Sequence, residues 1–215
     1  MYRTADKLLK QLKQLIRREF NRVGILGFDE LNTPRITRET IRLFDNLDRA
    51  NKGQFLAAAK KAYLDAVALA ISLGYTQGDT TKIDEIWLAE ILSSYDFISG
   101  YLYESEAERK RLRLVEEMAT SREYQNRTRY NDSLKRSANL WWTQTLHYML
   151  VTVDRATLDA FKDCGIERVR WHTNIDGREC NVCRDRDGKT YAIDKVPPKA
   201  HRNCRCYVTP ILKNK

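Results

Sequence analysis

The sequence lacks an apolar run long enough to cross a bilayer. Its longest uncharged stretch, residues 137–153, is broken by Asn139, Gln144 and His147, whereas a spanning helix needs about 20 predominantly apolar residues. Lysine and arginine interrupt the first 20 residues throughout, so we expect no signal peptide there. We therefore predict a protein of a reducing compartment, with no membrane partner.

Residue patterns for catalysis are also scarce. The chain has 3 histidines, and no Ser/His/Asp set, phosphate-binding glycine loop or carboxylate pair stands out. A zinc-knuckle nuclease of the HNH type needs a general-base histidine and ligands for a catalytic ion. Only His172, beside Asn174 and Asp176, fits that role, and we interpret it instead as part of a surface strand and turn. We expect no enzymatic activity and no small-molecule substrate.

The chain does contain a cluster of soft metal ligands near its C-terminal end. Cys180-x-x-Cys183 is followed by His201-x-x-Cys204-x-Cys206. Two short knuckles separated by a loop are a usual way to hold Zn²⁺ in a tetrahedron of four ligands. A disulfide framework is the alternative. The fifth cysteine, Cys164, makes the count odd, which favours metal.

The spacing also limits which residues bind the ion. The two-residue spacer lets both Cys180 and Cys183 reach one metal. The second pair comes from His201, Cys204 and Cys206, and we favour His201 with Cys204, leaving Cys206 as a packed thiol or substitute ligand. Coordination by four side chains leaves no open position for water, so we expect a structural zinc ion as the cofactor.

Basic charge is concentrated around these ligands. The chain carries 38 Lys+Arg against 29 Asp+Glu, and residues 165–215 hold 12 of the bases and 6 of the acids. A basic surface attracts phosphates in a salt-dependent manner, although interleaved acids would also give an ordinary solvated domain. The predicted nucleic-acid contacts are Arg178, Arg184, Arg186, Lys189, Arg202 and Arg205. Arg168 and Arg170 belong to the same basic excess.

Helix signals dominate up to residue 164. Apolar residues at spacings of three and four predict an amphipathic helix that ends near Gly24, a second helix after Thr37 and a third from Gly53 to Gly74. A fourth helix should begin at an N-cap at Thr81. Residues 104–136 indicate a largely exposed helix, and residues 138–161 a central apolar one.

The pattern changes after residue 164. Segments 166–173, 190–193 and 206–211 are rich in β-branched residues and predict three short strands. We expect an α+β fold, predominantly α, with a helical body over residues 1–164 and a zinc-stapled β module over 165–215. Residues 1–50 are candidates for separate N-terminal helices. The β module has few apolar residues, so bound metal should supply much of its stability.

The C-terminal string also carries a family resemblance. Trp171 and Thr173 precede an acidic turn at Asp176, the C-x-x-C pair and Asp187-Gly188-Lys189. A proline loop and the closing run from His201 to Cys206 follow. This order resembles the signature of the phage Mu F-like minor head protein family, also called the phage head morphogenesis domain. Arg202 departs from it, since the family often has proline there. The helical region is only generically similar.

The resemblance implies a minor head protein of a tailed phage or prophage, assembled in the bacterial host cytoplasm and present in the virion. It would act near the portal during capsid assembly or genome delivery. Its partners would be portal and other phage head proteins, with double-stranded DNA as a further contact. Two alternatives remain open at this stage: an HNH-type nuclease and a nucleic-acid-binding zinc module.

Overall fold

The predicted fold class, α+β and predominantly α, is confirmed. The computed structural model describes residues 2–25, 28, 33–76, 81–94, 102–174, 177 and 179–211. The helical part contains α1 (Arg3–Ile25), α2 (Thr33–Ser72), α3 (Glu85–Ser93), α4 (Tyr103–Glu123) and α5 (Arg127–Asp163). The C-terminal part contains β1 (Arg168–His172), α6 (Asn181–Arg186), β2 (Thr190–Ala192), the 3-10 turn η1 (Ile193–Lys195) and β3 (Tyr207–Pro210).

The second and third predicted helices are one continuous helix, so the expected break between them is wrong. α2 has 40 residues and is about 60 Å long at 1.5 Å per residue. Gly53 lies inside it, exposed and with nothing within 4 Å of a Cβ built there. A glycine inside a helix costs only about 1 kcal/mol, and buried Leu47 and Phe55 hold both sides of it in the core.

Two other helix boundaries differ from the prediction. The N-cap expected at Thr81 is Asp84, whose carboxylate accepts the Trp87 N–H at 2.8 Å. The single helix expected over residues 104–136 is interrupted between α4 and α5. There Gln125 has φ 52, and the Asn126 side chain caps α5 by accepting the Arg129 N–H at 2.9 Å. Asparagine before an apolar period is a helix-start signal, so this break was readable in the sequence.

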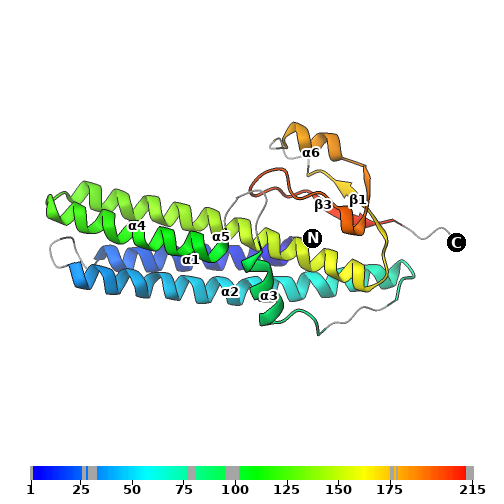
Figure 1. Cartoon of the computed structure of the whole chain (residues 1–215), viewed down its shortest axis with the longest axis horizontal. Coiled ribbons are helices and arrows are strands. Elements are labelled where there is room, and N and C mark those ends of the chain that lie inside the picture. Colours follow the sequence, from blue (N-terminus) through cyan, green and yellow to red (C-terminus); the bar gives the residue numbers. More distant parts are fainter. Residues whose placement is uncertain are drawn as a thin grey trace.

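The long helices pack side by side into an elongated bundle. α5 contacts α1, α2 and α4, as expected for the central apolar helix, and Figure 1 shows these four helices running alongside one another. Trp141 on α5 is fully buried and packs edge-on against Phe44 of α2, with ring centroids 5.0 Å apart. Among the described residues, no helix is long and apolar enough to cross a membrane.

The three predicted strands are present as one antiparallel sheet in the order β2-β1-β3. Figure 1 places the sheet and α6 over the C-terminal half of α5, close to the N-terminus of the chain. Val169, Trp171 and Val208 on the inner face belong to the same buried cluster as Leu9 and Val153 of the bundle. The division into two domains at residue 164 stays a prediction, and α2 continues through residue 50.

Candidate metal centre

The first knuckle is formed where the chain enters α6. Cys180 is the N-cap of this helix, and its Sγ accepts the backbone N–H of Cys183 at 3.4 Å. This local bond holds both sulfurs on the same side of the turn. Thr173 supports the arrangement, because its hydroxyl donates to the Cys183 carbonyl at 2.6 Å and its N–H donates to Asp187 Oδ1 at 2.7 Å. Thr173 and Asp187 thereby fix the knuckle against the end of β1.

The second knuckle is a tight turn before β3. The Cys204 N–H donates to the His201 carbonyl at 3.3 Å, and Asn203 has φ 61, a left-handed conformation in which asparagine is enriched. The turn brings His201 and Cys204 to the first knuckle. Cys183 Sγ lies 3.6 Å from His201 Nε2 and 3.6 Å from Cys204 Sγ.

All five residues singled out in the sequence therefore meet at one place. Two overlapping groups have their ligand atoms within 4.8 Å of one another: Cys180, Cys183 and His201, and Cys183, Cys204 and Cys206. Cys183 belongs to both groups and joins them. The cluster is compatible with metal binding, since a tetrahedral site needs four such donors and five are present.

A disulfide framework is absent among these residues. None of the five cysteines forms a disulfide bond, and the 3.6 Å between Cys183 Sγ and Cys204 Sγ is far longer than a disulfide bond of about 2.05 Å. Cys164 lies outside the cluster, buried at the C-terminal end of α5. It therefore neither pairs with the knuckles nor supplies a ligand.

The surroundings of three cysteines shift the pKa of their thiols. Cys183 and Cys204 are buried, and this burial raises the pKa of both thiols. Cys180 is only half-buried, and the backbone N–H of Cys183 lowers the pKa of its thiol. A bound cation inverts this situation because a coordinating thiol loses its proton outright. Cys183 and Cys204 are thus thiols that a soft cation can convert to thiolates by binding them.

The orientation of His201 is relevant to the choice of the fourth ligand. Its Nδ1 lies 3.0 Å from the Arg202 carbonyl oxygen. The tautomer with its proton on Nδ1 donates to that oxygen and leaves the lone pair of Nε2 facing Cys183. Metal-binding histidines usually donate their other ring N–H in this way. His201 is therefore set up as a ligand, while the choice between His201 and Cys206 stays a prediction.

A buried polar group ties the second knuckle to the helical bundle. The Tyr2 hydroxyl lies 2.7 Å from Asp154 Oδ1 and 3.1 Å from the Cys206 carbonyl oxygen. Lys199 Nζ lies 3.2 Å from both the Tyr2 hydroxyl and Asp154 Oδ2. Burial raises the pKa of Tyr2 and of Asp154. Sequence reasoning missed this group because Tyr2 and Asp154 are 152 positions apart and neither stands in a motif.

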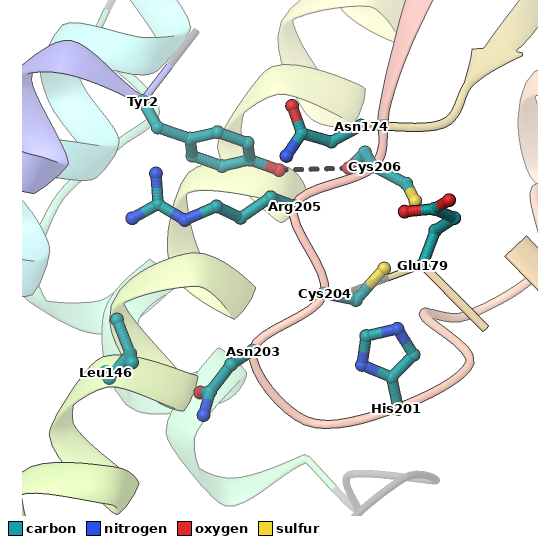
Figure 2. Close-up of a pocket in the computed structure, with 9 residues that line it drawn as sticks. All are labelled: Tyr2, Leu146, Asn174, Glu179, His201, Asn203, Cys204, Arg205 and Cys206. Carbon is teal, nitrogen blue, oxygen red and sulfur yellow. Dashed lines mark hydrogen bonds between the residues drawn. The ribbon is translucent and has the colours of Figure 1, made fainter. Parts of the chain in front are cut away.

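A cavity lies beside the cluster. It has a volume of 580 Å³, and Figure 2 shows Tyr2, Glu179, His201, Cys204 and Cys206 on its wall. The Tyr2 hydroxyl reaches across it to the Cys206 carbonyl, as the dashed line marks. The second knuckle therefore borders this cavity through His201, Cys204 and Cys206, and Leu146 of α5 lies on the same wall.

The structure describes five of the six predicted nucleic-acid contacts. Arg178 lies outside the described residues, as does Asp176. Arg205 pairs with Asp6 of α1 at 2.5 Å. Arg186 lies over the Trp171 ring and donates to the Pro198 carbonyl at 2.5 Å. Arg184, Lys189 and Arg202 are exposed, and direct DNA contact by this set stays a prediction.

Two of the three residues considered for a nuclease, His172 and Asn174, are described, and their surroundings differ. His172 is on the outer face of the sheet, where its ring stacks on Tyr207 and its Nε2 lies 2.7 Å from Thr209 Oγ1. Asn174 lines the cavity instead.

Comparison of the chain with protein-family models, with curated proteins and with solved structures gives no match.

Proposed function

We propose that this chain is a non-catalytic structural protein whose C-terminal module is held by one zinc ion. The ligands are Cys180, Cys183, His201 and Cys204, with Cys206 as a substitute ligand. The observation that carries the proposal is the pair of 3.6 Å distances from Cys183 Sγ to a sulfur of the second knuckle and to a ring nitrogen.

These distances agree with the edges of a zinc tetrahedron. In a tetrahedral site, Zn–S bonds are about 2.3 Å long and Zn–N bonds about 2.0 Å long. Two ligand sulfurs are then about 3.8 Å apart, and a sulfur and a nitrogen about 3.5 Å apart. Sulfur and imidazole ligands together favour zinc over the hard cations magnesium and calcium. With five protein donors for four positions, water has no place on the ion, which supports a structural role.

The biological role we propose is that of a minor head protein of a tailed phage or prophage, acting near the portal and located in the virion. The support is the C-terminal motif order together with the architecture. The long helices offer an extended surface for docking on portal and other head proteins. The basic module offers a contact for double-stranded DNA. The nuclease alternative has weaker support, because stacking on Tyr207 and the bond to Thr209 constrain His172.

Metal analysis of the purified full chain tests the zinc site. We expect about one zinc per chain. Cys183→Ser should lose it, because Cys183 belongs to both groups of ligands and serine does not replace a thiolate ligand. Cys164→Ser is the matched control, since Cys164 is a cysteine outside the cluster, and it should keep the metal. A folded wild-type protein without zinc would refute the proposal.

The same measurement decides the fourth ligand. If His201 is the ligand, His201→Ala should lower zinc affinity, with Cys206 replacing the lost nitrogen only in part, while Cys206→Ser leaves the affinity nearly unchanged. The reverse pattern would assign the site to four cysteines and leave His201 as a neighbour. Both variants alter residues of one turn, so each serves as the control for the other.

Co-expression with a portal protein encoded beside this chain tests the role in the phage head. We expect portal rings to retain the chain through affinity purification and size exclusion. Arg184→Glu combined with Arg186→Glu should leave this retention unchanged. Failure of the zinc-loaded chain to bind the portal would count against the head role without affecting the metal site. Tight duplex binding lost in the double variant would favour the nucleic-acid-binding alternative.

A further inference from the structure

The residues on the outer face of the small sheet belong neither to the metal cluster nor to the predicted nucleic-acid contacts. Along β1 the burial alternates, with Arg168 and Arg170 exposed and Val169 and Trp171 buried. Residues paired across strands share a face. The strand register therefore adds Thr190 and Ala192 of β2, and Thr209 and Tyr207 of β3, to the outer face.

Two rings on this face are held in parallel. His172 and Tyr207 stack with centroids 5.0 Å apart and planes inclined by 18°. The contact between His172 Nε2 and Thr209 Oγ1, 2.7 Å, fixes the imidazole. Tyr207 is 37% exposed and lies on the edge strand β3. A further planar group can therefore extend the stack beyond the sheet edge without rearrangement of the rings.

The charge of the face is of one sign. None of its outward positions on the three strands is acidic. No described carboxylate forms an ion pair with Arg168 or Arg170, whereas Asp194, just after β2, is paired with Lys162 at 2.8 Å. Arginine without a carboxylate partner beside an exposed aromatic ring is the combination that binds phosphates and bases together.

We propose that this face binds single-stranded nucleic acid. Unpaired bases stack on Tyr207, and the guanidinium groups of Arg168 and Arg170 contact the backbone phosphates. A duplex presents phosphates but hides its base faces, so the stacked rings favour a single strand over a duplex. None of the six nucleic-acid contacts predicted from the sequence belongs to the strand positions that form this face. The inference does not depend on the role in the phage head.

Fluorescence anisotropy with the full-length, zinc-loaded chain tests the proposal. The probes are a labelled 20-nucleotide oligothymidine and a 20-base-pair duplex. We expect tighter binding of the single strand. Tyr207→Ala should weaken it by about 5-fold to 150-fold, the loss of one stacked base, while Tyr207→Phe retains the affinity. Arg170→Gln should reduce the slope of log affinity against log salt by about 0.7.

Matched controls lie at the opposite end of the bundle. Tyr124, 68% exposed, follows α4, and Arg129 is exposed at the start of α5. Tyr124→Ala and Arg129→Gln should leave the affinity unchanged. Equal or tighter binding of the duplex, or unchanged binding by Tyr207→Ala, would overturn the proposal. If Tyr207→Ala does not fold, Arg170→Gln decides, because its side chain is exposed, and an unaltered salt slope would then be the refuting result.

Discussion

Replacing Tyr2 by phenylalanine tests whether the bundle positions the metal cluster. The substitution keeps the buried ring and removes only the hydroxyl, which lies 2.7 Å from Asp154 and 3.1 Å from the Cys206 carbonyl. A hydrogen bond to a charged group contributes about 1.5–3 kcal/mol. In the variant, buried Asp154 keeps its ion pair with Lys199 at 3.2 Å. We therefore expect the free energy of unfolding to fall by about 2 kcal/mol.

The same substitution should also weaken metal binding. The single hydroxyl proton is shared between Asp154 and the Cys206 carbonyl, so the contact with the knuckle is the weaker one. Its loss, about 0.5–1 kcal/mol, corresponds to roughly two- to five-fold in affinity. Urea unfolding gives the stability, and competition with a chelating dye gives the affinity for zinc. Tyr63→Phe is the matched control because the Tyr63 hydroxyl donates to Asp163 at 2.7 Å, away from the knuckles.

The control should lose stability but keep its metal affinity. If Tyr2→Phe and Tyr63→Phe change zinc affinity equally, the Tyr2 hydroxyl does not position the cluster. If Tyr2→Phe costs no stability, the bond to Asp154 contributes nothing net. The first result would refute the link between the bundle and the second knuckle, and the second would refute the free energy assigned to the bond with Asp154.

Two further predictions concern the helices. Gly53→Ala should raise the free energy of unfolding by about 0.5–1 kcal/mol in urea titrations, because Gly53 is exposed inside α2 with open space at its Cβ; a loss of stability would indicate that α2 is broken there. The hydrogen bond from Arg22 lowers the pKa of the Glu39 carboxyl. The ionised carboxylate therefore stabilises the fold at pH values above the ordinary glutamate pKa of about 4.3. This stabilisation is lost as the pH falls through the lowered pKa of the folded state. Glu39→Gln should therefore lower the free energy of unfolding by about 0.5–1 kcal/mol at neutral pH. In acid, urea titrations of the variant and the wild type should give the same stability. A difference that persisted in acid would exclude the charge of Glu39 as its cause.

Local patterns explain which features were predictable. The three strands followed from β-branched residues, and α1 from an apolar stripe whose members Leu9, Leu12 and Ile16 are buried. The continuity of α2 was missed because a local rule treats Gly53 as a boundary, whereas buried neighbours on both sides outweigh its cost of about 1 kcal/mol. The helix α6 was missed because it has 6 residues, too few for an apolar period.

The sequence alone identified the metal ligands, since the spacing in Cys180-x-x-Cys183 and His201-x-x-Cys204 lets each pair reach one ion through a local turn. That the two pairs meet was decided by the fold, because Cys183 and Cys204 are 21 positions apart. Contacts between distant segments were decided only by the tertiary structure. The bond from Tyr2 to Asp154 joins residues 152 positions apart, and the stack of His172 on Tyr207 depends on the pairing of β1 with β3. Spacing constrains atoms a few bonds apart, whereas such long-range pairs form only when whole elements pack to bury their apolar faces.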